Sequence, residues 1–165
     1  MKKLYITRHA KSDWGFDGLK DIDRPLNQRG YDDAYRLSAF IKKKEQVPQL
    51  LVSSPAIRAI STALIFARNF SYPENEIKIV KEIYESSVAT LKQCVTDFSE
   101  DYSSIMLFGH NPGLTKFFNE VSDSEIDNLP TCAVTLIEFD AATWKNVFKK
   151  EGKTIFTEFP KEFKP

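Results

Sequence analysis

The chain has 165 residues and as many Lys and Arg as Asp and Glu residues, so its formal net charge is zero. Its composition, 42% hydrophobic and 28% charged, is typical of a globular domain and excludes a disordered polar chain. A balanced charge favours no polyanionic partner, and we expect no nucleic-acid binding. No apolar stretch approaches the roughly 20 residues of a membrane span, so we expect no membrane association.

The first residues include Lys2 and Lys3, but the apolar run after them is too short for a signal peptide. The two cysteines, Cys94 and Cys132, are far apart and form no Cys-x-x-Cys pair. Without an export signal, we expect buried thiols rather than a disulfide, and a cytoplasmic location. Nothing in the sequence indicates an oligomeric state.

Strand and helix signals alternate along the chain, without a repeat or a linker. We expect strands at Lys3–Thr7, Leu50–Ser53, Ile77–Val80, Ser104–Phe108, Ala133–Phe139 and Gly152–Phe159. We expect one helix from the N-cap Asn27 to about Lys44, and a second from the N-cap Ser54 and the first-turn Pro55 to about Phe70. Further helices are expected over Thr90–Phe98, from Pro112 to about Val121, and briefly around Ala141–Phe148. The last residues, with Pro160 and Pro165, indicate a surface tail.

This alternation predicts one α/β domain over residues 1–165. The short connections favour a three-layer αβα sandwich, with a mostly parallel central sheet and helices on both faces. In such sheets, ligands bind beyond the carboxyl ends of the strands.

Three of the predicted strand ends carry groups that suit a phosphate. The first strand leads into Arg8 and His9, and the second into a helix that contains Arg58 in its first turn. The fourth leads into His110 and Asn111. The chain has two histidines, and both follow a predicted strand.

Arginine offers a planar, permanently charged group that matches phosphate oxygens in pairs. Helix N-termini add free backbone N–H groups, and a neutral imidazole is a nucleophile near neutral pH. These groups together predict a bound phosphoryl group and a histidine that receives it. Two histidines also suit zinc, but arginines repel a cation, and no His-Glu-x-x-His or Cys-x-x-Cys spacing is present. No Gly-x-Ser-x-Gly elbow or Walker A loop is present either.

Several motifs resemble those of the histidine phosphatase (phosphoglycerate mutase-like) superfamily. Thr7–Ala10 resembles its RHG/RHA signature, Ser53–Ala59 its second-arginine motif, and Gly109–Asn111 its second-histidine motif. The segment Asp23–Leu26 with Gly30 also resembles small phosphohistidine phosphatases of the SixA type. The resemblance extends over roughly Lys3 to Phe139, with the motifs in the family's order.

The resemblance implies a role for each matched residue. His9 would be the nucleophile that becomes phosphohistidine, and Arg8, Arg58 and His110 would hold the phosphoryl oxygens. Glu85, after the third strand, would be the acid/base carboxylate; the alternative is a solvated loop carboxylate. No metal or cofactor is implied.

Some positions leave two interpretations open. Asn111 would donate to the phosphate or only cap its helix, and Lys11, where the family often has a carboxylate, would add charge to the pocket or be solvated. Gly15 stands where many mutase-like members have asparagine after the tryptophan, so the resemblance implies that one phosphate contact would be absent. Trp14 and Phe16 would line the pocket or pack in the core. The predicted substrate rim consists of Lys11, Ser12, Trp14 and Arg24.

The sequence therefore predicts a metal-independent phosphatase that acts through His9 on protein phosphohistidine or another small phosphorylated substrate. The alternatives are a phosphoglycerate mutase-like enzyme, a phosphosugar phosphatase, or a non-catalytic phosphate-binding module. Residues 86–109 have room for only one helix and one strand between Glu85 and His110. No long insertion is expected to cover the site there, which favours hydrolysis.

Overall fold

The structure, a computed structural model, describes residues 1–160. Its strands are β1 (Lys2–Arg8), β2 (Leu50–Ser53), β3 (Lys78–Ile79), β4 (Ser104–Gly109), β5 (Val134–Phe139) and β6 (Lys153–Glu158). Its α-helices are α1 (Gln28–Lys44), α2 (Ile57–Phe70), α3 (Val88–Thr96) and α4 (Gly113–Val121). Short 3-10 helices are η1 (Asp21–Asp23), η2 (Glu74–Glu76), η3 (Lys81–Ile83) and η4 (Trp144–Lys149).

The strands form one sheet in the order β3-β2-β4-β1-β5-β6. The pairs β1–β4, β2–β4 and β2–β3 are parallel, whereas β5 pairs antiparallel with β1 and β6. Arg8 is opposite Gly109, and Ser53 is opposite Phe108, so β1, β2 and β4 end at the same edge of the sheet. The prediction of a mostly parallel sheet is confirmed, and this edge is where the predicted site residues meet.

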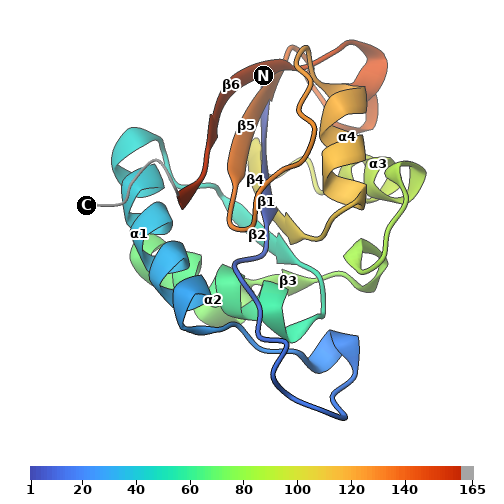
Figure 1. Ribbon diagram of the computed structural model, residues 1–165. Coiled ribbons are helices and arrows are strands. Elements are labelled where there is room, and N and C mark those ends of the chain that lie inside the picture. The colour runs from blue at the N-terminus through green and yellow to red at the C-terminus, as the bar shows by residue number, and fades with distance from the viewer. Residues whose placement is uncertain (161–165) are drawn as a thin grey trace.

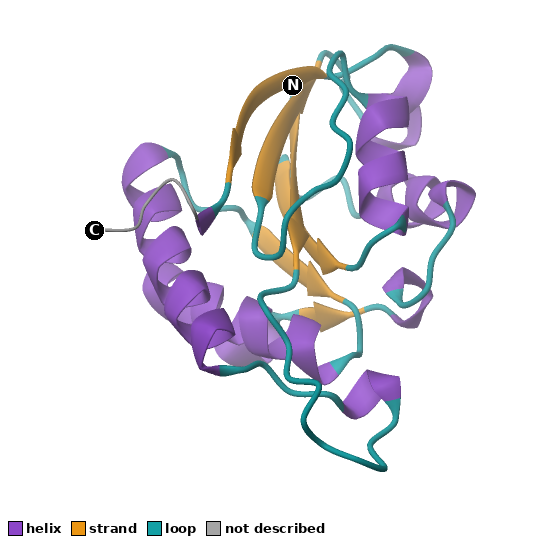
Figure 2. Ribbon diagram, viewed as in Figure 1, coloured by secondary structure: helices purple, strands orange, loops and turns teal. Residues whose placement is uncertain are grey.

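Helices cover both faces of the sheet, which confirms the three-layer prediction (Figures 1 and 2). Side chains alternate between the two faces along β1, because successive residues of a strand point in opposite directions. Leu4 and Ile6 pack with Phe117 and Trp144 on the side of α3 and α4. Tyr5 packs with the apolar residues of α1 and α2 on the other side.

The start of α1 is as predicted, because the Asn27 side chain accepts a hydrogen bond from the Gly30 amide at 2.8 Å. The start of α2 is not. This helix begins at Ile57 with Ala56 as its N-cap, so the prediction of Ser54 as N-cap and Pro55 as first helical residue is wrong. The helix starts later because the Ala56 carbonyl oxygen is the one that accepts from the Ala59 and Ile60 amides, each at 3.0 Å. The Ser54 hydroxyl accepts from the Ala56 amide and also contacts His110.

Other boundaries differ by a few residues. Helix α3 begins at Val88, because Ser87 caps it by accepting from the Thr90 amide at 3.1 Å. The predicted helical stretch around Ala141–Phe148 is the 3-10 helix η4, whose Trp144 is fully buried. Pro160 is buried rather than part of a surface tail, and residues 161–165 lie outside the described part of the chain.

The two cysteine thiols are both free, Cys132 buried and Cys94 half-buried. Burial raises the pKa of both thiols. Within residues 1–160, no helix is both long and apolar enough to cross a bilayer.

Candidate active site

The predicted site residues gather beyond the carboxyl ends of β1, β2 and β4. Arg8 is the last residue of β1 and His9 follows it, Arg58 lies in the first turn of α2, and His110 follows β4. The segment between β1 and α1 extends past this edge of the sheet (Figure 1). Together they surround a cavity of about 360 Å³ lined by Arg8, His9, Lys11, Ser12, Trp14, Asp21, Arg24, Arg58, His110, Asn111 and Thr131.

His9 is buried and held in one tautomer. Its Nδ1 lies 2.7 Å from the carbonyl oxygen of Ala10. A carbonyl oxygen only accepts hydrogen bonds, so Nδ1 carries the proton and Nε2 keeps its lone pair. The Ala10 amide donates to the Thr62 hydroxyl at 3.0 Å, and that hydroxyl donates to the carbonyl oxygen of Arg58 at 2.7 Å. Helix α2 therefore fixes the loop that orients the imidazole.

Both imidazoles are neutral at physiological pH. Burial first, and then the charges of Arg58 and Arg8, lower the pKa of His9 from 6.5 to about 4, and the hydrogen bond to Ala10 opposes this shift. Burial, together with His9 and Arg58, lowers the pKa of His110 to about 3. The two ring centroids are 5.2 Å apart. A neutral His9 is the form that can act as a nucleophile.

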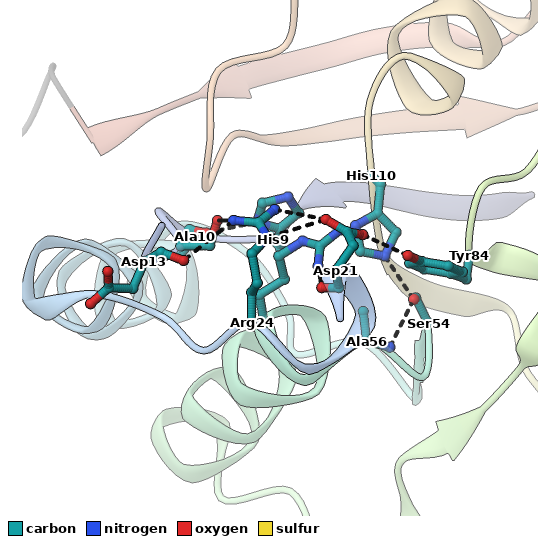
Figure 3. A network of polar contacts seen from close by, with 11 residues as sticks. His9, Ala10, Asp13, Asp21, Arg24, Ser54, Ala56, Tyr84 and His110 are labelled. Carbon is teal, nitrogen blue, oxygen red and sulfur yellow. Dashed lines mark hydrogen bonds and ion pairs between the residues drawn. The ribbon is translucent and has the colours of Figure 1, made fainter. Parts of the chain in front are cut away.

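The Ser54 hydroxyl orients the second histidine. His110 Nε2 lies 2.7 Å from Ser54 Oγ, which also accepts from the Ala56 amide at 3.2 Å (Figure 3). Since no other described residue accepts the Ser54 hydroxyl proton, this proton is free to be donated to Nε2. In that tautomer His110 carries its own proton on Nδ1, which is buried and has no partner among residues 1–160.

The two arginines also present buried nitrogens without a partner. Arg8 donates from Nη1 to the Leu129 carbonyl oxygen at 2.8 Å, which anchors the guanidinium. Arg58 donates from Nη1 to the Asp21 carbonyl oxygen at 2.6 Å and from Nη2 to its carboxylate at 3.0 Å. Nε of each arginine is buried and unpaired among the described residues. Buried unpaired donors are costly, so the site suits an anion with several oxygens.

Asp21 connects the second arginine to the loop before α1. Its carboxylate accepts from Arg58, from Arg24 Nε at 3.1 Å, and from the Tyr84 hydroxyl at 2.5 Å (Figure 3). The Tyr84 hydrogen bond is the largest of the causes that lower the pKa of Asp21 to about 2, and burial opposes them. Asp21 is not among the residues predicted from the sequence, because its partners Arg58 and Tyr84 are 37 and 63 positions away along the chain. The one signal in the sequence that points to Asp21 is its position as a carboxylate in the segment next to the predicted site.

The predicted rim residues line the same cavity. Arg24 donates to the buried Ser12 hydroxyl at 2.8 Å, and its guanidinium carbon lies 3.5 Å from the centre of the Trp14 ring. Trp14 is 74% exposed and Phe16 is 54% exposed, so neither packs in the core. The loop therefore presents aromatic surface next to the cavity.

The side chain of Asn111 is used inside its own loop. Its Nδ2 donates to Asn128 Oδ1 and to the Leu129 carbonyl oxygen, each at 3.0 Å, which uses both amide hydrogens. Its Oδ1 accepts from the Thr115 amide and hydroxyl in the first turn of α4. These contacts support the capping role and leave no side-chain donor for a phosphate.

Glu85 lies beside the main cavity rather than in it. Its side chain is exposed, its backbone φ is +53°, and the described residues offer its carboxylate no hydrogen bond or ion pair. It lines an adjoining cavity of about 360 Å³ together with Arg58, Tyr84 and His110. The two cavities thus share Arg58 and His110.

No group of three His, Cys, Asp or Glu side chains within residues 1–160 is arranged to hold a metal ion. The charged groups of the main cavity are dominated by arginine and lysine.

A comparison with protein families gives a match to the family described as "Histidine phosphatase superfamily (branch 1)" over residues 4–104. The chain belongs to the histidine phosphatase superfamily. The matched segment includes Arg8, His9, Arg58 and Glu85 and ends before His110. The resemblance stated from the motifs is thereby confirmed.

Two sequence relatives are similar to this histidine phosphatase. An uncharacterised chloroplastic protein of Arabidopsis thaliana is 28% identical over 159 residues, which is 92% of this chain and 72% of that protein. Phosphoglycerate mutase 1 of Saccharomyces cerevisiae is 36% identical over 67 residues, which is 39% of this chain and 27% of the mutase.

Solved structures share the fold. The protein histidine phosphatase SixA, complexed with tungstate, superposes with a TM-score of 0.81 at 20% identity, covering 98% of this chain and 99% of that one. The mycobacterial glucosyl-3-phosphoglycerate phosphatase, complexed with VO3, gives a TM-score of 0.72 at 11% identity and covers 94% of this chain and 98% of that one. The chain therefore has the SixA-like, phosphoglycerate mutase-like fold.

Proposed function

We propose that this histidine phosphatase hydrolyses its substrate without a metal ion, through a phosphohistidine on His9. The observation that carries the proposal is the state of His9: the bond from Nδ1 to Ala10 leaves the Nε2 lone pair free in a buried, neutral ring. This ring lines one cavity with Arg8, Arg58 and His110, each of which has a buried nitrogen without a partner.

In the first step, His9 Nε2 attacks phosphorus and the bond from phosphorus to the leaving oxygen or nitrogen breaks. The Nε–H groups of Arg8 and Arg58 and the Nδ1–H of His110 would bind the phosphoryl oxygens as charge develops on them. In the second step, water attacks the phosphohistidine, and inorganic phosphate leaves with His9 restored. Both steps depend on positioning and charge rather than on covalent chemistry by other residues.

Glu85 is the proposed acid and base. It would protonate the leaving atom in the first step and take a proton from the attacking water in the second. Its carboxylate has no partner among the described residues, and it lines the cavity that shares Arg58 and His110 with the main one. If Glu85 is instead only a solvated carboxylate, replacing it should leave the rate of hydrolysis unchanged.

Metal independence is supported by the charges that the chain itself supplies. Arg8, Arg24, Arg58 and Lys11 all line the main cavity, with Asp21 as its one carboxylate. Four cations can neutralise a phosphoryl dianion and would repel a divalent metal ion. We therefore expect full activity in the presence of a chelator.

Protein phosphohistidine is the substrate that we favour, with another small phosphorylated compound as the alternative. The SixA structure, whose name states a protein histidine phosphatase, matches this chain over nearly its whole length. The exposed ring of Trp14, which lines the cavity, suits contact with a large substrate. The predicted cytoplasmic location stays a prediction, and the Arabidopsis relative is described as chloroplastic.

A mutase or phosphosugar phosphatase is the second candidate. The glucosyl-3-phosphoglycerate phosphatase shares the fold, and the yeast mutase shares part of the sequence. Between Glu85 and His110, however, the chain has only α3, β4 and short connections. No insertion from this segment closes the site against water, which favours hydrolysis over transfer.

A hydrolysis panel on the purified chain tests the proposal. It compares a phosphohistidine peptide, phosphosugars, 3-phosphoglycerate and an aryl phosphate, each with and without EDTA. We expect the phosphohistidine peptide to be preferred by about tenfold, roughly 1.4 kcal/mol in the barrier, with no effect of EDTA. Interconversion of phosphoglycerates without release of phosphate would contradict hydrolysis, and loss of activity in EDTA would contradict metal independence. A non-catalytic module would hydrolyse none of the compounds.

A further inference from the structure

A second groove opens from the active-site cavity on the side of α1. It has a volume of about 260 Å³ and shares Arg8, Lys11 and Thr131 with the main cavity. Arg29 and Asn128 lie farther along it. The groove therefore adjoins the main cavity, and Arg8, Lys11 and Thr131 line both.

The groove is basic. Arg8, Lys11 and Arg29 line it, and no Asp or Glu residue does. The Lys11 side chain is half-buried, and no described residue gives its ammonium a hydrogen bond or an ion pair. Arg29 pairs through Nε with the buried Asp33 at 3.4 Å, which also pairs with Arg36. The Asp33 carboxylate thus forms ion pairs with two arginines. The terminal nitrogens of Arg29 have no partner among residues 1–160.

The backbone holds the two basic groups together. The Asn27 amide donates to the Lys11 carbonyl oxygen at 3.0 Å. Gly30, next to Arg29, packs so tightly against this carbonyl that a Cβ atom would lie 2.2 Å from its oxygen. Only glycine fits this approach, so the first turn of α1 is locked to the backbone of Lys11. The backbone positions of Lys11 and Arg29 are therefore fixed relative to each other before any ligand binds.

The opposite side of the main cavity has a different character. There the adjoining cavity is lined by Glu85 and Tyr84, and Arg58 is its one cationic side chain. A substrate that carries a negative group besides its phosphoryl group would consequently be drawn to the side of Lys11 rather than to the side of Glu85. Lys11 is only two residues from His9, so their Cα atoms are at most roughly 7 Å apart and both side chains line the main cavity.

We propose that this groove is a second anion subsite, in which Lys11 and Arg29 bind a carboxylate or phosphate that the substrate carries near its phosphoryl group. The inference rests on the proposed function, because it assumes that the phosphoryl group sits at His9. The anion would come from an acidic side chain beside a phosphorylated residue or from a second acidic group of a small molecule. It makes Lys11 and Arg29 specificity-determining residues.

Binding of non-hydrolysable phosphonates tests this without requiring catalysis. Phosphonoacetate, 3-phosphonopropionate and 4-phosphonobutyrate are each compared with the alkylphosphonate of the same length by calorimetry. We expect the carboxylate to tighten binding by about fivefold at the best length, the contribution of one or two partly exposed ion pairs. In a Lys11→Met and Arg29→Met double variant we expect this preference to fall below about twofold.

The control is Lys42→Met, which removes an exposed lysine of the same helix as Arg29. The Lys42→Met variant should keep the preference for the carboxylate. A variant that carries Lys11→Arg instead of Lys11→Met should regain this preference. Equal binding of the paired phosphonates by the wild type, or a preference that survives the double variant, would overturn the subsite. Failure of every phosphonate to bind would also overturn it. Loss of hydrolysis in the panel above, with the phosphonate preference intact, would instead contradict the proposed function alone.

Peptide substrates then identify the source of the anion. Phosphohistidine peptides with Glu or Gln beside the phosphorylated residue are compared by kcat/KM. A preference for Glu over Gln in kcat/KM that Lys11→Met abolishes, and that Lys42→Met keeps, assigns the groove to protein substrates. A carboxylate preference confined to the small phosphonates assigns it to a small molecule.

Discussion

Asp21 binds Arg58 twice, through its carbonyl oxygen at 2.6 Å and through its carboxylate at 3.0 Å. Arg58 is 94% buried at its side chain, whereas the carboxyl side chain of Asp21 is about half exposed. The pair therefore joins a 3-10 turn at the surface to the first turn of α2. It leaves Nε as the Arg58 nitrogen that is free to meet a phosphoryl oxygen.

Asp21→Asn should lower kcat/KM by about tenfold, because charge-assisted hydrogen bonds to Arg58, Arg24 and Tyr84 are weakened and the guanidinium of Arg58 loses its fixed orientation. Steady-state kinetics on an aryl phosphate measure the change. Asp23→Asn is the matched control, since Asp23 is an exposed carboxylate of the same turn without a side-chain partner among the described residues. Unchanged activity of Asp21→Asn would show that Arg58 is oriented without it.

Ser54→Ala should lower kcat by about tenfold while the protein stays folded. The substitution removes the hydroxyl that lies 2.7 Å from His110 Nε2, so the proton of His110 is no longer directed to Nδ1. Ser53→Ala provides the comparison, because Ser53 is an equally buried neighbour whose hydroxyl donates to the Ser54 carbonyl oxygen. If both variants lose the same activity, the effect comes from the packing of the turn and not from His110.

Glu85→Gln should separate good leaving groups from poor ones. An acid is needed most when the leaving oxygen is basic, so hydrolysis of an alkyl phosphate should fall by about a hundredfold, and that of a nitrophenyl phosphate by less than about threefold. The ratio of kcat/KM for the two substrates is the readout. Glu82→Gln, an exposed carboxylate of η3, is the control. Equal losses on both substrates would remove Glu85 from the acid role.

The pH dependence follows from the lowered pKa of His9, about 4 instead of 6.5. Protonation of Nε2 abolishes the nucleophile, so the lowered pKa keeps the active neutral form down to about pH 5. NMR titration of the imidazole nitrogens in the free protein should show neither ring protonating near 6.5. The unfolded chain binds these protons at higher pH than the folded one, so stability should decrease as the pH falls from 6.5 toward 4. A midpoint of His9 between 6 and 7 would be inconsistent with its burial.

The four residues at the strand ends could be predicted from the sequence because each lies beside a strong local signal. Arg8 and His9 follow an apolar strand, and His110 follows another, so parallel pairing was enough to bring them together. The sheet, its layers and most element boundaries follow from the same alternation. The antiparallel pairing of β5 and β6 is the part of the sheet that this alternation does not specify, because α4 precedes β5 and η4 precedes β6, as helices precede the parallel strands.

The remaining features depend on contacts between distant residues. Ser54 is a residue type that is common at N-caps. No local pattern indicates that its hydroxyl contacts His110, which lies 56 residues later. The partners of Asp21 are likewise too far along the chain for a local pattern to indicate. The sequence leaves two roles open for Asn111, phosphate binding and helix capping. Its amide hydrogens are bound to Asn128 and Leu129, which supports the capping role. Local patterns therefore locate a site, whereas its orienting contacts require the fold.

The covalent state of His9 is the most direct test of the mechanism. Rapid-quench mass spectrometry during turnover of a phosphodonor should show one added phosphoryl group, stable in base and labile in acid, on the peptide that contains His9. His9→Ala should show none, and His110→Ala, which keeps the nucleophile, should still be labelled at a lower rate. Labelling of another residue, or full activity of His9→Ala, would contradict the account.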